Sequence, residues 1–218
     1  MASFLVIGMG RFGSSVATEL HRMRHEVLVV DDKEDSVSGI VDQVTNAIIG
    51  DAKDEAVLRS LGIDNFDCVI VAIAGGIEDS VLTTIMLKEM RAKRIICKAQ
   101  NEWHAKILTQ LGVDKVIRPE SDMGKRVALS LATQNIIDYL EVSPDYSVVE
   151  ILTPEQWAEK SIKGNNLHRK YGITVIAIRS IDTDCVEFSP SADTVLNKGD
   201  ILTVIGSIKG LDSISILK

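Results

Sequence analysis

The first 31 residues contain the pattern that most constrains how this chain folds. An apolar run, Phe4 to Ile7, leads directly into glycines at positions 8, 10 and 13, then into a helical stretch and a second apolar run that ends at Asp31. Strand, glycine-rich turn, helix and strand with a terminal carboxylate form the fingerprint of a dinucleotide-binding unit. Asp31 stands 31 − 8 = 23 positions beyond Gly8, close to the separation of about 20 in that fingerprint. The sequence therefore predicts a nucleotide site.

Each residue of the fingerprint has a physical role. Gly8 permits the tight turn, Gly10 lets the backbone approach a pyrophosphate, and Gly13 lets the helix pack closely on the sheet. The N-terminus of that helix favours an anion, because its amides are unpaired and its dipole is positive there. Asp31 is suited to ribose hydroxyls and would repel the 2′-phosphate of NADP. A glycine-rich turn without a ligand is the alternative, and the matching strand, helix and acid favour binding.

Strands and helices alternate along residues 1–118. Beyond the first unit, strands are expected at 46–49, 68–72, 94–98 and 115–117, and helices at 34–43, 55–61, 77–90 and 101–111. Strands that are hydrophobic throughout and alternate with helices indicate a parallel sheet covered on both faces. Residues 1–120 are therefore predicted to form a Rossmann-like, doubly wound α/β domain.

Ligands of such sheets bind at the carboxyl ends of the strands. This rule adds Asp51 and Ala52 after the third strand, residues 74–76 after the fourth, and Lys98 after the fifth. Asp51 is expected either to contact adenine or to N-cap the helix that begins near Glu55. Lys98 is either a phosphate contact or a solvated lysine at a strand end.

A different organisation begins after Pro119. Residues 120–140 are predicted to form one long helix or two, so that 121–141 connect the domains and supply an interface. The apolar stripe of these helices is Met123, Val127, Leu131 and Ile136. The stripe either packs on its own sheet or crosses to a partner subunit.

Residues 142–218 are expected to form a small α+β domain. Its predicted strands are 147–152, 173–179, 185–188 and 201–206, with a short helix within 161–171 and a closing helix at 209–217. A module of this size is marginal alone, so pairing with a second copy is expected to stabilise it.

Composition excludes some functions and favours a location. The net charge of −7 argues against nucleic-acid binding, which usually needs a basic patch. Cys68, Cys97 and Cys185 are an odd number and widely separated, which favours buried thiols in a reducing compartment over disulfides. No run approaches the roughly 18 apolar residues of a membrane span, so a soluble cytoplasmic protein is expected.

Several motifs together resemble the KtrA/TrkA family, cytosolic proteins with a regulator-of-potassium-conductance (RCK) domain. They occur in the family's order along essentially the whole chain: VIGMGRFG, GDAKDE, CKAQNEWHAKIL, VIRPESDMGKRV, LHRKYGITVIAI and KGDILTVIG. One N-terminal and one C-terminal module match the Ktr type better than the tandem TrkA type. The resemblance implies dimers assembled into a ring, typically an octamer, that binds ATP, ADP or NAD(H) and gates a membrane potassium-transporting partner similar to KtrB or TrkH.

The resemblance also assigns roles to single residues of the first domain. Arg11 matches a position that approaches the terminal phosphates of ATP, and Phe12 beside it is counted with the cofactor-binding residues. Glu120 matches a position associated with a divalent cation, Mg²⁺ or Ca²⁺. Lys53 departs from the family, because relatives often have Thr after the preceding Asp/Asn-Ala pair.

In the C-terminal domain the resemblance implies a cyclic di-AMP site. The matching segment runs from Ile162 to Ile173 and includes Leu167 and His168. His168 stands where some relatives have an arginine that contacts the ligand. An imidazole replaces the charge of a guanidinium only when protonated.

The competing function is that of an NAD-dependent oxidoreductase, and a methyltransferase is a weaker third class. The chain contains no Tyr-x-x-x-Lys sequence. His104 is the one acid or base expected near the cleft, and an exposed place on a polar helix surface is the commoner role for such a residue. A regulatory, non-enzymatic function is therefore predicted.

Overall fold

The computed structural model describes residues 1–132, 136–143 and 145–215. They fall into two compact units, residues 1–119 and a second unit that begins at Glu120. The elements of the first unit are β1 (Ser3–Ile7), α1 (Arg11–Arg22), β2 (Glu26–Asp31), α2 (Glu34–Ser38), η1 (Val41–Gln43), β3 (Asn46–Ile49), α3 (Glu55–Ser60), η2 (Ile63–Asn65), β4 (Cys68–Val71), α4 (Ile77–Glu89), β5 (Ile95–Lys98), α5 (Glu102–Gln110) and β6 (Lys115–Ile117).

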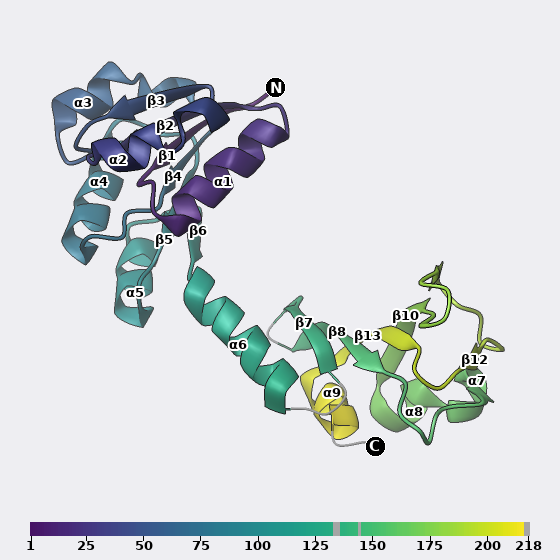
Figure 1. The fold of residues 1–218 in the computed structure, drawn as a ribbon. Helices are drawn as coiled ribbons and strands as arrows, with labels where there is room; N and C mark the ends of the chain where they lie inside the picture. The colour runs from purple at the N-terminus through teal and green to yellow at the C-terminus, as the bar shows by residue number, and fades with distance from the viewer. Residues whose placement is uncertain (133–135, 144, 216–218) are drawn as a thin grey trace. The chain divides into compact units, whose positions relative to one another are not determined.

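The first unit is built on a six-stranded parallel sheet in the order β3-β2-β1-β4-β5-β6 (Figure 1). Ile7, at the end of β1, lies opposite Val30 of β2 and Val71 of β4. The strand order reverses between β1 and β4, and this is the place where ligands bind in doubly wound sheets. The predicted Rossmann-like fold is confirmed.

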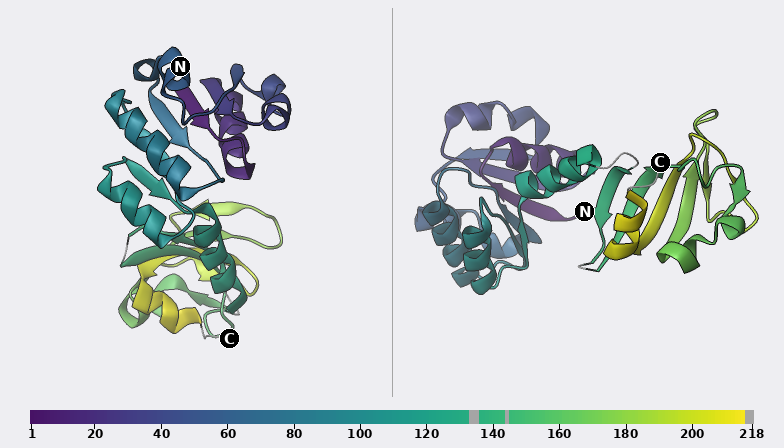
Figure 2. Two further views of the ribbon diagram at one scale, coloured as in Figure 1. Left: turned by 90° about the vertical axis from the view of Figure 1, so that its left-hand side faces the viewer. Right: turned by 90° about the horizontal axis from the view of Figure 1, so that it is seen from below.

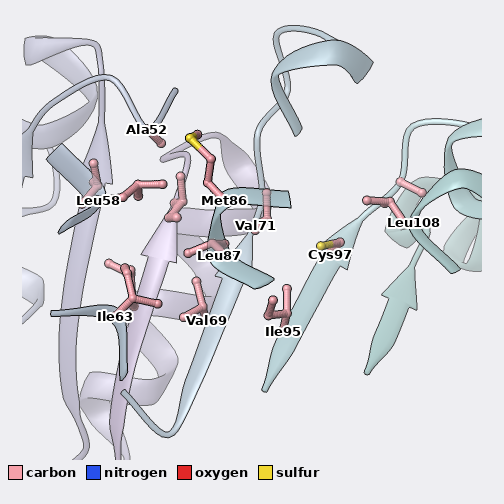
Figure 3. Close-up of a cluster of buried hydrophobic side chains, with 14 residues drawn as sticks. Ala52, Leu58, Ile63, Val69, Val71, Met86, Leu87, Ile95, Cys97 and Leu108 are labelled. Atoms are coloured by element: carbon pink, nitrogen blue, oxygen red, sulfur yellow. The ribbon is translucent and has the colours of Figure 1, made fainter. Parts of the chain in front are cut away.

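Alternate side chains of the strands pack into separate layers on the two faces of this sheet. Leu5 and Ile7 of β1 belong to a cluster with residues from α3, α4 and α5, drawn in Figure 3. Val6, between them, belongs to the opposite cluster, which contains Ala17 of α1. Figure 1 likewise shows α1 on one side of the sheet and α4 and α5 on the other. Both faces are therefore covered, as hydrophobic parallel strands require.

The second unit has an antiparallel sheet in the order β11-β10-β13-β8-β7 and a short β9–β12 ladder. Figure 2 shows α9 beside the larger sheet in both views. The elements are α6 (Pro119–Ala132), β7 (Ile136–Glu141), β8 (Tyr146–Leu152), β9 (Lys160–Ser161), α7 (Ile162–Asn165), α8 (Leu167–Tyr171), β10 (Ile173–Arg179), β11 (Val186–Phe188), β12 (Val195–Leu196), β13 (Ile201–Ser207) and α9 (Ile208–Ser215).

The helix predicted over residues 120–140 is wrong in its last part. Helix α6 ends at Ala132, residues 133–135 lie outside the described residues, and Ile136–Glu141 form β7. Strand β7 pairs with β8, and Ile136 is buried in the core of the second unit. Sheet hydrogen bonds and burial of a β-branched side chain therefore outweigh the helical period. Within the chain, the remaining stripe residues are exposed: Met123, Val127 and Leu131.

Two other predicted helices are interrupted. The stretch 34–43 divides at Gly39 into α2 and η1, and the stretch 161–171 divides at Asn166, which adopts φ +53° between α7 and α8. The closing helix is present as α9, and residues 216 and 217 of that prediction lie outside the described residues. Within the described part of the chain, no helix has the length and apolar character needed to span a bilayer.

Candidate nucleotide-binding site

A cleft of about 200 Å³ lies at the carboxyl ends of β1 to β4, beside the point where the strand order reverses. Ligands of doubly wound sheets bind at this position. Its walls come from the glycine loop, the end of β2, the first turn of α2, the loop after β3, the loop after β4 and the first turn of α4. The lining residues are Ile7, Gly8, Met9, Gly10, Val30, Asp31, Asp32, Lys33, Ser36, Gly50, Asp51, Ala52, Lys53, Ile73, Ala74, Gly75 and Asp79.

The three glycines of the loop have different surroundings. Gly8 has φ +95°, and a Cβ there would lie 2.9 Å from the carbonyl carbon of Ala72. A Cβ on Gly13 would lie 1.9 Å from the carbonyl oxygen of Gly8. Around Gly10, by contrast, the nearest atom is the Cβ of Ala74 at 4.0 Å. The protein therefore requires Gly8 and Gly13 for its own packing, and the space over Gly10 is left for a ligand.

The N-terminus of α1 follows the glycine loop and lies at the cleft, because its N-cap residue Gly10 is part of the lining. Gly10 is the N-cap residue, and no side chain caps the helix there. The first amides of a helix have no partner within the helix, so they are available to an anion. Arg11 is exposed at the first position of α1. This end of the cleft is suited to phosphate groups.

Asp31 lies at the end of β2 and is tied to the glycine loop. Its Oδ2 accepts the N–H of Met9 at 2.6 Å, and its Oδ1 accepts the N–H of Lys33 at 2.9 Å. Each carboxylate oxygen has a second acceptor direction, so the group retains capacity for ribose hydroxyls. The bond to Met9, which the sequence did not reveal, fixes the loop and the carboxylate relative to each other.

Asp51, in the loop after β3, was expected either to contact adenine or to N-cap the next helix. The N-cap of α3 is Asp54, whose Oδ1 accepts the N–H of Ala56 at 2.8 Å. The N-cap role for Asp51 is therefore wrong. Asp51 instead accepts the N–H of Lys53 at 2.9 Å through Oδ1 and lines the cleft beside Ala52. A contact with adenine remains the prediction for this carboxylate.

The predicted cofactor residues separate into two groups. Gly8, Gly10, Asp31, Asp51 and Ala52 line the cleft. In the part of the chain that the structure describes, the remaining predicted residues do not line it: Arg11, Phe12, Gly13 and Lys98. Their roles in binding stay predictions.

Phe12 and Lys98 contribute to the structure outside the cleft lining. Phe12 packs against the hydrophobic cluster under α1, and Lys98 is half-buried at the end of β5.

Several lining residues were not predicted as ligand contacts. Asp32 and Lys33 directly follow β2, so the strand-end rule could have found them. Ser36 of α2 and Asp79 of α4 come from helices, and only the tertiary structure brings them to the cleft.

The predicted metal residue, Glu120, is exposed in the first turn of α6, which also contains Asp122. Among the described residues there is no cluster of three or more histidine, cysteine or acidic side chains that could hold a metal ion. A cation at Glu120 would therefore need oxygen ligands from elsewhere, such as phosphate groups. The metal site stays a prediction.

In the second unit, the four predicted ligand residues differ in exposure. Leu167 and Ile173 are buried in the hydrophobic core, and Ile162 packs against that core. His168 is exposed on α8. Of these four side chains, His168 alone presents a polar group to solvent.

His104 is not on the helix surface, as the sequence suggested, but is fully buried on α5. Its Nδ1 accepts the N–H of Gln100 at 3.3 Å, and burial lowers the pKa of the imidazole. Gln100 in turn donates through Nε2 to the carbonyl of Ala74 in the cleft wall. His104 therefore lies outside the cleft lining and is linked to the cleft wall through Gln100.

Protein-family models match both units. The TrkA-N domain matches residues 4–119, and the TrkA-C domain matches residues 147–215. Among solved structures, the chain is similar to the GsuK RCK domain, with a TM-score of 0.70, 18% identity and coverage of 99% of this chain and 47% of the other. It is also similar to the GsuK channel bound to NAD, with a TM-score of 0.70, 17% identity and coverage of 99% and 39%. This chain spans less than half of each, and the likeness shows the fold.

Curated relatives match along nearly the whole chain. Ktr system potassium uptake protein A of Bacillus subtilis (strain 168) is 44% identical over 208 residues, which cover 95% of this chain and 93% of the relative. Ktr system potassium uptake protein C of the same strain is 43% identical over 205 residues, with 94% and 92% covered. These matches confirm the resemblance that the motifs indicated. The chain therefore belongs to the KtrA/TrkA family, with a TrkA-N domain followed by a TrkA-C domain.

Proposed function

We propose that this protein is a cytoplasmic, nucleotide-binding regulatory subunit of a potassium uptake system. ATP or ADP binds in the cleft of the first unit and changes the shape of a ring of subunits. The ring, an octamer built from dimers, gates a membrane potassium-transporting partner of the KtrB or TrkH type. The observation that carries the proposal is a cleft lined by the glycine loop and Asp31, in a chain 44% identical to a Ktr system potassium uptake protein.

The cleft provides different chemistry for the two ends of a nucleotide. The open space over Gly10 and the amides at the start of α1 suit the phosphates. Asp31 suits the ribose hydroxyls, and Asp51 suits the amino group of adenine. A 2′-phosphate would meet Asp31 and Asp32. NAD(H) is accordingly a further ligand of the same cleft, and the GsuK channel supports this because a structure of it is bound to NAD.

Discrimination between ATP and ADP depends on the γ-phosphate. A ligand shifts a conformational equilibrium only by its difference in affinity for the two states. Arg11, at the start of α1, would contact the terminal phosphate, and Glu120 would contact it through Mg²⁺ or Ca²⁺. A coupling of about 1–3 kcal/mol is sufficient for a useful regulatory bias.

The second unit is proposed to pair with its copy in a neighbouring subunit and to bind cyclic di-AMP there. His168 supports this, because it is an exposed polar side chain in the segment that matches the family's ligand region. Calorimetric titration of the full chain with cyclic di-AMP tests this, and the absence of binding would remove cyclic di-AMP from the proposal.

The test of the main proposal is calorimetry of the full chain with ATP, ADP, NADH and cyclic di-AMP. Saturable binding of ATP and ADP without oxidation of NADH supports a regulatory subunit. Turnover of NADH would instead support the oxidoreductase alternative. Absence of binding by both adenine nucleotides would contradict the proposal.

A further inference from the structure

An ion pair joins two walls of the cleft. Nζ of Lys53, from the loop after β3, lies 3.4 Å from Oδ1 of Asp79 and 3.8 Å from Oδ2 of Asp51. Asp79 belongs to the first turn of α4, and all three residues line the cleft. The ammonium group is therefore shared between two carboxylates that face the ligand space.

The backbone of this loop is held in place independently of the ion pair. Asp51 accepts the N–H of Lys53, which closes a local turn, and the buried Thr83 of α4 donates to the carbonyl of Ala52 at 3.3 Å. Ala52 itself is packed in the hydrophobic core shown in Figure 3. Removing the charge of Lys53 should consequently leave the loop in position.

The charge of the cleft is unusual for a site that accepts an anion. Its lining includes four aspartates, at positions 31, 32, 51 and 79, and two lysines, at positions 33 and 53, so their formal sum is 2 − 4 = −2. Without Lys53 the sum would be −3. Each phosphate of a nucleotide is repelled by this excess, and the repulsion weakens when salt screens it.

The ammonium group of Lys53 keeps its charge in this position. The hydrogen bond with Asp79, and then the negative charge of Asp51, raise the pKa of Lys53. Lys53 therefore remains a cation throughout the physiological pH range.

We infer that Lys53 is the counter-ion that lets this acidic cleft accept a polyphosphate, and that it sets how strongly the site prefers ATP and ADP over uncharged adenosine. The inference rests on the proposed nucleotide-binding function. Lys53 acts through its charge on Asp51 and Asp79, and the number of phosphates on the ligand determines the size of its effect.

The experiment compares the full chain with Lys53→Met, Asp79→Asn and the double variant. The double variant lacks the ion pair but restores the formal sum of −2, because it loses one charge of each sign. ADP and ATP are titrated calorimetrically, and adenosine is measured by displacement of labelled ADP. Lys93→Met is the matched control, since Lys93 pairs with Asp67 before β4, at the opposite ends of the strands.

Lys53→Met should weaken ATP binding by about threefold or more at low salt, ADP binding by less, and adenosine binding by less than about twofold. The double variant and Lys93→Met should bind each ligand within about twofold of the wild type, and high salt should remove the differences. An equal loss for adenosine and ATP, or a double variant as weak as Lys53→Met, would overturn the inference. If the wild type and Lys53→Met bind ADP and ATP equally well, the inference about Lys53 is overturned and the proposed function is not. A wild type that binds no adenine nucleotide would overturn the proposed function as well.

Discussion

Replacing Gly10 by alanine should weaken nucleotide binding by at least about tenfold while leaving the fold nearly unchanged. Gly10 has φ −70° and ψ 179°, which alanine adopts readily, and the nearest atom to an added Cβ is 4.0 Å away. The new methyl group would occupy the space through which a pyrophosphate approaches the backbone. Alanine is a poorer N-cap than glycine, which costs at most about 1 kcal/mol of stability.

Gly13→Ala, by contrast, should destabilise the fold. Its Cβ would lie 1.9 Å from the carbonyl oxygen of Gly8, and real Cβ contacts are essentially never below 3.0 Å, so an atom must move by at least 3.0 − 1.9 = 1.1 Å. The carbonyl oxygen and the Cα that would carry the new Cβ are both backbone atoms, and α1 and the sheet hold this backbone in place. Overpacking of this kind costs roughly 1–3 kcal/mol or more.

The assays are chemical unfolding for stability and calorimetry with ADP for binding. Gly124→Ala is the matched control, because it makes the same change in α6 with no atom within 4 Å of the new Cβ. We expect Gly10→Ala to lose at least about tenfold in ADP affinity, and Gly124→Ala to bind like the wild type. A Gly10→Ala variant that binds ADP normally would refute the assignment of this loop as the phosphate site.

Three other perturbations give separable results. Asp31→Ala should lose ADP affinity and also stability, because Met9 and Lys33 lose a charged acceptor worth about 1.5–3 kcal/mol for each bond; unchanged calorimetric affinity would remove Asp31 from the site. Arg11→Ala should weaken ATP more than ADP, and equal losses would show that Arg11 does not contact the γ-phosphate. The pKa of His104 is lowered by burial from 6.5, so its contribution to stability is present above about pH 6.5 and is lost as the pH falls below it. Urea unfolding of the wild type and His104→Leu from about pH 7.5 to pH 5.5 should therefore show the wild type losing stability relative to the variant, and parallel curves would contradict this sign.

The sequence was most informative where a few adjacent residues determine the structure. The strand, glycine turn and helix from Phe4 onward are local, so spacing alone predicted them and the carboxylate at Asp31. It was less informative where distant pairing decides the outcome. Residues 136–140 have apolar spacing compatible with a helix, and only hydrogen bonds with β8 make them a strand.

Contacts between distant segments were also beyond sequence reasoning. The pairing of Lys53 with Asp79 joins residues 26 positions apart, 79 − 53, on different elements. The burial of His104 likewise depends on how α5 packs against the sheet. Residue type alone predicts neither the partner of Lys53 nor the burial of His104, because lysine and histidine are usually found at the surface or partly exposed.

The most direct test of the account is potassium flux through the membrane transporter reconstituted with this protein in vesicles, with ATP plus Mg²⁺ or with ADP at saturation. We predict that the two nucleotides give different fluxes with the wild type and that Gly10→Ala needs at least about tenfold more nucleotide to show the same difference. Equal fluxes with ATP and ADP for the wild type would contradict the account, because the nucleotide would then be a structural ligand and not a regulator.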